Sequence, residues 1–425
     1  MRRISILLAF RAATSSFGGS DTTCCALALR SFSTTKRSST SNNIISNIVA
    51  NGLSRGGGKN INSQTITTRR NMSSSSSSSE AQKTMTLSEK AMAITGLPPG
   101  PYPVGVKTVQ IDGDPKRGRG LQTEFWYPTT TEASSSMPLT KYSDYLGLGA
   151  CKDPEQALAS ANAGNAIGGY RDGISIEELD DPDRTTWLTN AIRDAPVAQA
   201  TTTNTKWPLV VFSHGSGAYR ASYSFWTEFL ASYGYVVAAC DHPGSARFTI
   251  VDGEVVTPGG QRSKRLQMEA DRPLDLIQII DGVEENSTGD DLFASVDTNN
   301  VAITGMSFGG FTTAATLELL DPRVRAGVMM CSSMARSGSQ DYHTPSRKNK
   351  SVPVMAMIGT EDTVLGEYDN DASRKYVDTH TDADAYLLEI VRGGHVSFTS
   401  CEMYDPDYGN GINVHGESKM LPQPG

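Results

Sequence analysis

The chain has 425 residues, 38% of them apolar, and a formal net charge of −8. This length allows one large folded domain with extensions, and the apolar content suffices for a sizeable core. No run approaches the ~18 apolar residues of a membrane-spanning helix, so we expect no transmembrane segment. The six cysteines lack C-x-x-C spacing, which disfavours a disulfide framework and predicts no metal site.

The first 80 residues differ in composition from the rest of the chain. Residues 1–79 hold ten Lys and Arg residues and one acidic residue, whereas the remainder holds 28 basic and 45 acidic residues, a net charge of −17. An acidic body disfavours nucleic acid as a partner. The Arg- and Ser-rich leader over residues 1–80, with its run Ser73–Ser79, is typical of an organelle transit peptide.

A short motif within this leader favours one organelle. Arg30-Ser31-Phe32-Ser33 resembles a mitochondrial processing site, with an arginine shortly before the cut. A secretory signal fits less well, because the apolar stretch Ile4–Phe10 is short and Arg11 interrupts it with a charge. We expect a mitochondrial address, with a plastid address, secretion or a tail without any address as alternatives. The folded domain is expected over residues 96–425.

The folded domain begins with a predicted hairpin. Residues 107–111 and 121–127 alternate like strands and are joined by a turn region containing Gly and Pro. The next stretch, residues 129–207, shows no obvious strand, and helices are predicted within it at 154–163 and 176–195. Insertions of this length are usually functional, as a lid for example, or disordered.

A serine turn stands at the centre of the remaining sequence. Val301–Ile303 is an apolar, mostly β-branched strand, and Gly305-Met306-Ser307-Phe308-Gly309 follows it, with a helical pattern over 311–320. Strand, G-x-S-x-G and helix in that order is the context of a nucleophile elbow, where a serine sits on a strained turn above the sheet. The sequence therefore predicts Ser307 as a nucleophile, whereas the alternative is a Gly-rich strand end.

Apolar strands alternate with helical segments on both sides of this turn. Strands are predicted at 208–213, 235–240, 325–331, 353–359 and 385–391, and helices near 222–233 and 274–284. This alternation predicts a mostly parallel sheet with helices on both faces. Eight strands with the serine after the fifth indicate the α/β-hydrolase fold.

A serine nucleophile needs a base and an acid, and in that fold the acid comes after the serine and the base after the acid. His395 comes after the eighth strand in a Gly-Gly-His loop, and Asp362 directly follows the seventh strand. We predict His395 as base and Asp362 as acid, with neighbouring Glu361 as a lesser candidate for the acid. Chain order or local context disfavours the other histidines, which are His214, His242, His343, His380 and His415.

Two backbone N–H groups are expected to bind the oxyanion of an acyl-transfer reaction. One belongs to Phe308, the residue after the nucleophile, and the other should come from the loop after the third strand. That loop is His214-Gly215-Ser216-Gly217, and Ser216 is the predicted second donor. A tight turn that merely requires glycine is the alternative interpretation of this loop.

Several stretches of the sequence resemble one protein family specifically. Residues 208–220 (PLVVFSHGSGAYR), 230–239 (LASYGYVVAA) and 305–310 (GMSFGG) resemble plasma-type platelet-activating-factor acetylhydrolases, as do residues 100–106 (GPYPVGV) and 125–128 (FWYP). Bacterial dienelactone-hydrolase-like esterases share many of these features. In the animal acetylhydrolases the acid follows the sixth strand. That position here is Cys331-Ser332-Ser333, and the acid comes after the seventh strand, as in dienelactone hydrolases.

The resemblance implies a serine carboxylic-ester hydrolase that needs no cofactor and releases short acyl groups. Its expected partners are a small ester or a short-acyl phospholipid, which would allow peripheral contact with a membrane. The alternatives are a dienelactone-hydrolase-like esterase of small metabolites and a non-catalytic binding protein on the same fold. Only residues 332–352 lie between the sixth and seventh strands, where this fold usually carries a cap, and they are too few for a helical cap. Residues 129–207 or 241–285 are therefore expected to roof the site.

Overall fold

The computed structural model describes residues 99–398, except for 114–116, 148, 150, 163–188, 201–205, 252, 258–261, 333–350, 381 and 392. The predicted transit peptide, its processing motif and the C-terminal tail lie outside the described residues. So does most of the helix predicted at 176–195.

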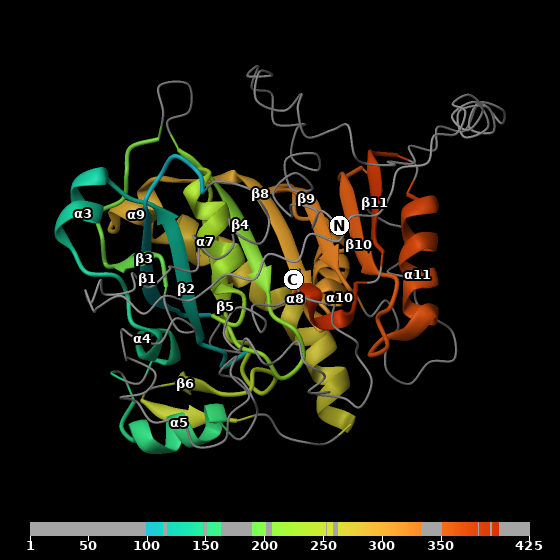
Figure 1. The fold of residues 1–425 in the computed structure, drawn as a ribbon, viewed down its shortest axis with the longest axis horizontal. Helices are drawn as coiled ribbons and strands as arrows, with labels where there is room; N and C mark the ends of the chain where they lie inside the picture. Colours follow the sequence, from blue (N-terminus) through green and yellow to red (C-terminus); the bar gives the residue numbers. More distant parts are fainter. Residues whose placement is uncertain are drawn as a thin grey trace, which may run out of the picture. The chain divides into compact units, whose positions relative to one another are not determined.

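A nine-stranded sheet runs through the described domain (Figure 1), in the order β11-β10-β9-β8-β4-β5-β2-β1-β3. All neighbouring strands are parallel except that β2 is antiparallel to both β1 and β5. The strands are β1 (Val104–Ile111), β2 (Leu121–Pro128), β3 (Ala191–Arg193), β4 (Trp207–Ser213), β5 (Val236–Cys240), β8 (Val296–Met306), β9 (Val324–Met330), β10 (Val354–Gly359) and β11 (Ala385–Ile390). This is the predicted α/β-hydrolase fold, beginning with the predicted antiparallel hairpin.

The main sheet was predicted to have eight strands and has nine. The additional strand β3 lies within the region where no strand was expected and where a helix was predicted to end. It pairs with Val104–Val106 of β1 at the edge of the sheet. Its three residues are too few to show an alternating pattern, so its pairing depends on β1 rather than on a local preference.

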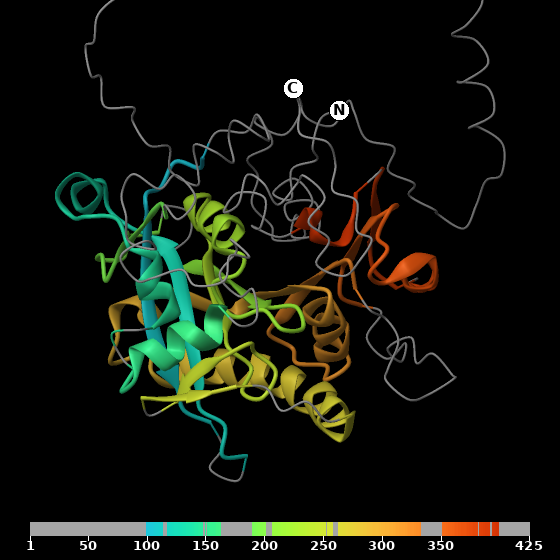
Figure 2. The same ribbon diagram turned by 60° about the horizontal axis from the view of Figure 1, so that its bottom comes forward.

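Helices cover both faces of the sheet (Figures 1 and 2). An apolar core lies on each face, because side chains of a strand alternate between its faces. On one face, Trp226 and Leu230 of α7 pack against Val210 and Phe212 of β4. On the other face, α8, α10 and α11 cover the sheet. The helices are α3 (Thr131–Ser136), α4 (Tyr142–Leu146), α5 (Pro154–Asn162), α7 (Ser224–Ser232), α8 (Arg262–Glu285), α9 (Asp291–Ala294), α10 (Phe308–Leu317) and α11 (Gly366–Asp378), with the 3₁₀ helix η4 (His395–Phe398).

The described parts of the 129–207 insertion contact the β1–β2 side of the domain. Tyr145 of α4 is fully buried, its hydroxyl accepts a hydrogen bond from Trp126 Nε1 at 3.0 Å, and it donates to Glu228 Oε1 of α7 at 2.9 Å. The Lys152 N–H, just before α5, donates to the Gly253 carbonyl in the turn of the β6–β7 hairpin (Thr249–Val251 and Glu254–Val256). These contacts tie the insertion to the domain. Residues 163–188 of this predicted roof lie outside the described part of the chain.

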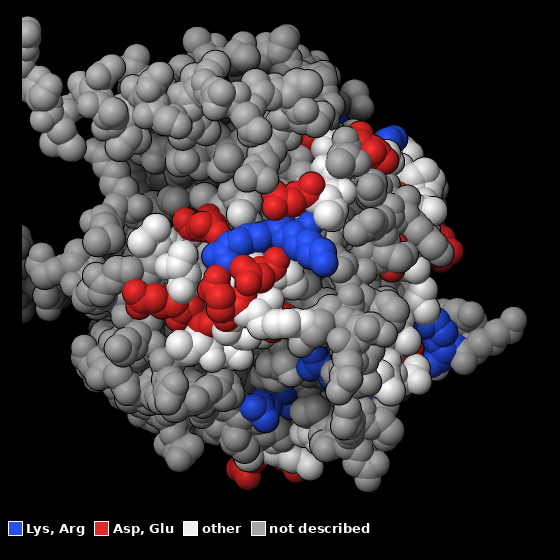
Figure 3. All heavy atoms as spheres, turned by 90° about the vertical axis from the view of Figure 1, so that its right-hand side faces the viewer, with Lys and Arg blue, Asp and Glu red and all other residues white. Residues whose placement is uncertain are grey.

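The surface around α11 mixes both charges, and Figure 3 shows basic side chains lying among acidic ones on this side. Arg374 of α11 pairs with Glu367, Asp371 and Glu389 at 2.5–2.7 Å. The arginine is thus matched by nearby carboxylates. Among the described helices, none is both long enough and apolar enough to cross a bilayer.

Candidate active site

Ser307 occupies the turn between β8 and α10 in a strained backbone conformation. Its φ of 58° and ψ of −117° lie outside the regions that non-glycine residues usually adopt. Such a residue costs on the order of 1–3 kcal/mol, and surrounding structure must hold it there. The Ser307 side chain is partly exposed at the end of a buried strand. These are the features that the G-x-S-x-G pattern predicts.

The glycines of the motif allow the elbow to pack tightly. A Cβ on Gly309 would lie 1.9 Å from the Ser213 carbonyl oxygen at the end of β4, and one on Gly305 would lie 2.5 Å from the Gly309 backbone. No side chain fits at either position. The absence of a Cβ therefore brings the start of α10 against the end of β4, next to the loop that follows β4.

Neighbouring strand ends bring the other predicted residues to the same edge of the sheet. The Ser307 N–H donates to the Met330 carbonyl of β9 at 2.8 Å, and the Cys331 N–H donates to the Met357 carbonyl of β10 at 2.8 Å. Asp362 follows β10, and His395 follows β11. The carboxyl ends of parallel strands share one edge, which is where α/β proteins place their sites.

Asp362 and His395 form a buried hydrogen-bonded pair. Asp362 Oδ2 accepts from His395 Nδ1 at 2.7 Å, and these residues are 3% and 8% exposed, so solvent screens the pair little. Asp362 Oδ1 accepts from the N–H groups of Val364 and Leu365, both at 3.0 Å. A carboxylate only accepts, which assigns the proton to Nδ1 and leaves Nε2 as the basic nitrogen.

The environment keeps Asp362 ionised. Burial raises its pKa, but the hydrogen bond from His395, the electrostatic attraction of that residue, the Leu365 N–H and the Cys331 thiol together lower it more, so the pKa lies below its ordinary value. Glu361, the other candidate acid, is exposed, and its N–H donates to the Gly393 carbonyl. The structure thus places Asp362, rather than Glu361, against the imidazole.

The structure does not join Ser307 to His395. Among the described residues, no hydrogen bond connects the Ser307 hydroxyl with the imidazole, although both lie after strands of the same sheet edge. Catalytic hydrogen bonds are often long in enzymes without substrate and tighten in the complex. The observed geometry is therefore an acid–base pair with a strained serine at the same edge.

The loop His214–Gly217, here called the oxyanion loop, presents a free backbone donor. The Gly215 carbonyl accepts from His214 Nδ1 at 2.7 Å and from the Ala218 N–H at 3.3 Å. In a trans peptide the carbonyl and the N–H point in opposite directions, so these bonds direct the Ser216 N–H away from them. Within the described part of the chain, neither the Ser216 N–H nor the Phe308 N–H has a hydrogen-bond acceptor.

A buried ion-pair cluster anchors the far end of this loop. The fully buried Arg220 donates from its backbone N–H to Asp241 Oδ1 at 2.7 Å and from Nη1 to Asp241 Oδ2 at 2.5 Å. Its Nε donates to Glu124 Oε2 of β2 at 3.1 Å. Breaking such a pair would leave an uncompensated buried charge, so Arg220 fixes where the chain continues after the loop.

Cys331 is a site residue to which no sequence motif points. It directly follows β9, has a positive φ of 41°, and its buried thiol donates a hydrogen bond to Asp362. Cys331, Asp362 and His395 place possible metal-ligand atoms within 4.8 Å of one another. Because Asp362 Oδ2 and His395 Nδ1 already bond each other, an ion there would displace that hydrogen bond. The arrangement fits an acid–base pair better than a metal centre.

A second serine–histidine–aspartate chain was also unexpected, because chain order disfavoured His242 as a base. It consists of Ser213, His242 and Asp275 and lies behind the oxyanion loop. Its members come from the end of β4, the residues after β5 and helix α8, which are far apart in the sequence. No local motif marks this arrangement.

Comparison with known proteins gives similarity over part of the chain. The family model described as platelet-activating factor acetylhydrolase, isoform II, matches residues 184–267, which include the oxyanion loop. The platelet-activating factor acetylhydrolase of Bos taurus is 33% identical over 170 residues, 33% of this chain and 38% of that protein. The Gallus gallus protein of the same name is 32% identical over 176 residues, 33% of this chain and 42% of that protein. The chain thus spans less than half the length of the curated relatives it matches.

A solved structure supports the fold over a longer region. The ferulic acid esterase from Streptomyces cinnamoneus superimposes with a TM-score of 0.50 and 22% sequence identity, covering 76% of this chain and 81% of that chain. At this identity the likeness concerns the fold alone. The likeness supports the fold described above, and the chain has the α/β-hydrolase fold.

Proposed function

We propose that the chain is a serine carboxylic-ester hydrolase that releases short acyl groups. The observation that carries this proposal is the buried Asp362–His395 hydrogen bond at the same sheet edge as a serine with a φ of 58°. The sequence similarity to platelet-activating factor acetylhydrolases over residues 184–267 supports the ester substrate. A small ester or a short-acyl phospholipid, met at a membrane surface, is the proposed substrate.

The reaction would use each residue in a distinct role. Ser307 Oγ attacks the ester carbonyl carbon while its proton passes to His395 Nε2, and Asp362 stabilises the resulting imidazolium. The N–H groups of Ser216 and Phe308 hold the oxyanion. The imidazolium then gives its proton to the departing alcohol. Water, deprotonated by the same imidazole, hydrolyses the acyl-enzyme and releases the carboxylic acid.

A fluorophosphonate probe tests this function directly, because it phosphonylates a serine that a neighbouring base activates. The expected result is one covalent label on Ser307, with loss of p-nitrophenyl acetate hydrolysis. Ser307→Ala should keep its fold by circular dichroism, take no label and lose several orders of magnitude in kcat, since triad members act as a unit. An unlabelled wild-type protein without hydrolysis would support the non-catalytic binding protein instead.

A second candidate is a dienelactone-hydrolase-like esterase of small metabolites. The position of Asp362 after β10, instead of after β9, favours it. Kinetics on a panel of lactones, aryl esters and short-acyl phosphocholines would separate the two candidates. A preference of at least tenfold in kcat/KM for the lactones would replace the acetylhydrolase proposal.

The cellular address is a separate proposal. The leader with ten basic residues and one acidic residue, together with the Arg30–Ser33 motif, supports mitochondrial import. Residues 1–79 fused to a fluorescent protein should co-localise with a mitochondrial marker. A plastid or extracellular signal would refute this address.

A further inference from the structure

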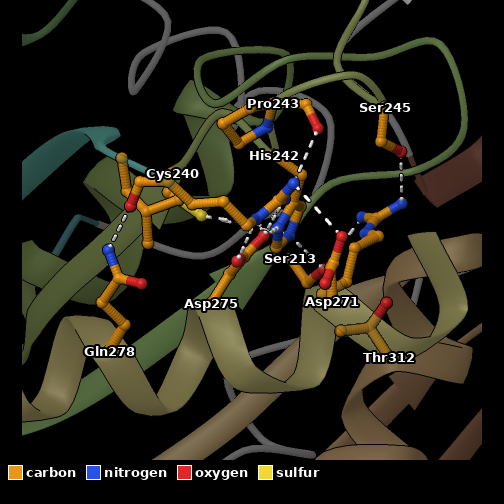
Figure 4. Close-up of polar contacts among 12 residues, drawn as sticks. Ser213, Cys240, His242, Pro243, Ser245, Asp271, Asp275, Gln278 and Thr312 are labelled. Carbon is orange, nitrogen blue, oxygen red and sulfur yellow. Dashed lines mark hydrogen bonds and ion pairs between the residues drawn. The ribbon is translucent and has the colours of Figure 1, made fainter. Parts of the chain in front are cut away.

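The second serine–histidine–aspartate chain connects α8 to the strand that leads into the oxyanion loop. His242 Nδ1 donates to Asp275 Oδ2 at 2.9 Å, and His242 Nε2 accepts from Ser213 Oγ at 2.9 Å. Figure 4 shows His242 between the two side chains. All three residues are fully buried. Because the Asp275 carboxylate only accepts, the tautomer of His242 and the direction of the Ser213 hydroxyl are fixed.

The Ser213–His242–Asp275 hydrogen-bond network is not arranged for nucleophilic catalysis. Arg272 Nη2 donates to the same Ser213 Oγ at 3.0 Å, so the hydroxyl acts as donor and acceptor at once. Burial, together with the charge of Arg272, lowers the pKa of His242 to about 3. Such an imidazole would not take up the proton that a general base receives at neutral pH. The Ser213–His242–Asp275 network is therefore a fixed support rather than a second catalytic triad.

Arg272 is the member of this network that reaches the oxyanion loop. Besides Ser213, its Nη2 donates to the His214 carbonyl, and its Nη1 donates to Ser245 Oγ at 3.2 Å. The guanidinium carbon lies 4.3 Å from the ring centroid of Phe308. One fully buried side chain thus contacts both segments that supply the proposed oxyanion donors.

Holding the His214 carbonyl fixes the first peptide plane of the loop. The N–H of that same peptide belongs to Gly215 and donates to the Tyr223 hydroxyl at 3.2 Å. A peptide bonded at both ends cannot rotate freely. The His214 ring, whose Nε2 accepts from the His242 N–H at 3.3 Å, then binds the Gly215 carbonyl through Nδ1 at 2.7 Å. That second bond orients the Ser216 N–H. The order of dependence runs from Arg272 through His214 to Ser216.

We propose that Arg272 is the positioning residue of the oxyanion hole, holding the His214 carbonyl so that the Ser216 N–H is aligned before substrate binds. This proposal rests on the proposed esterase function for its kinetic consequence. Its structural part, the fixing of the loop, can be tested without any activity. Arg272 would act through the loop and would not touch the reacting atoms.

The kinetic test compares Arg272→Met and Arg272→Lys with a matched control, Arg265→Met. Arg265 also stacks on Phe308, at 3.7 Å from the ring centroid, but its hydrogen bond goes to Glu269 and not to the loop. Losing one oxyanion donor costs about 10²–10³ in kcat. Arg272→Met should lose about 10²-fold in kcat with KM within about threefold, Arg272→Lys less, and Arg265→Met less than about threefold.

Two further readouts separate positioning from general destabilisation. The affinity of a trifluoromethyl ketone, which mimics the tetrahedral adduct, should fall by the same factor as kcat/KM. Hydrogen–deuterium exchange of residues 212–218 should be faster in Arg272→Lys than in the wild type, with the rest of the sheet unchanged. This exchange measurement also decides the matter if Arg272→Met does not fold.

The outcomes distinguish the two proposals. A wild type that neither hydrolyses esters nor reacts with the probe refutes the function, while faster exchange at 212–218 still supports the role of Arg272 in fixing the loop. Unchanged exchange in Arg272→Lys would overturn that role. So would a folded Arg272→Met with wild-type kcat, or a loss confined to KM.

Discussion

Replacing Asp362 by Asn tests the acid–base pair at a single atom. In the wild type, Oδ1 accepts two backbone N–H groups, from Val364 and Leu365, and Oδ2 accepts from His395 Nδ1. The Asn carbonyl should keep the two N–H groups, which leaves its NH₂ facing Nδ1. Nδ1 must then accept, so the ring proton moves to Nε2, where it blocks proton transfer from Ser307.

The structure also indicates why the substituted amide should not flip by 180° to restore the original imidazole tautomer. The reversed orientation would lose two backbone hydrogen bonds, each worth about 1 kcal/mol, and would set NH₂ against two N–H donors. The wrong tautomer should therefore predominate. The equivalent substitution in a serine protease triad lowers kcat by about 10⁴, which corresponds to about 5.5 kcal/mol of transition-state stabilisation.

The assay is steady-state hydrolysis of p-nitrophenyl acetate by Asp362→Asn, with circular dichroism as the check of folding. We expect kcat to fall by about 10⁴ with KM within a few-fold, because the substrate contacts are untouched. Glu361→Gln changes the exposed neighbour and should alter kcat by less than about twofold. A variant Asp362→Asn that keeps over about a tenth of kcat, or a larger loss in Glu361→Gln, would show that Asp362 is not the acid.

Three further predictions concern substrate size, pH and the thiol. On p-nitrophenyl esters, kcat/KM should peak at acetyl to butyryl and fall by octanoyl, whereas a long-chain groove would add about 0.8 kcal/mol per buried methylene and give a profile still rising at dodecanoyl. Burial raises the pKa of Glu228 to about 8 from 4.5, so the folded state holds a proton that the unfolded state has lost, and stability should fall as pH rises from about 4.5 through 8. Glu228→Gln should reduce that fall in urea midpoints measured at pH 5, 6.5 and 8, and parallel curves for the two proteins would contradict the assignment. Cys331→Ala should lower kcat about three- to tenfold by removing the thiol hydrogen bond to Asp362, with partial recovery in Cys331→Ser, whereas an unchanged kcat in Cys331→Ala would leave the thiol without a role.

Local sequence patterns were sufficient for the elbow and for the order of the main strands. Ser307 follows from glycine spacing between an apolar strand and a helix, since a tight strand–turn–helix excludes a Cβ at Gly305 and Gly309. Asp362 and His395 follow from the ends of β10 and β11, because parallel strands place their carboxyl ends at one edge. In each case the information lies within a few consecutive residues.

Contacts between distant segments were decided only in the tertiary structure. The strand β3 has no pattern of its own and exists through pairing with β1. Neither Arg272 nor Cys331 carries a motif. The first reaches His214, 58 residues away, and the second reaches Asp362 across the neighbouring strand. Residue type and spacing determine which local turn or strand forms, whereas the hydrogen bonds of a buried side chain depend on which elements the packing brings beside it.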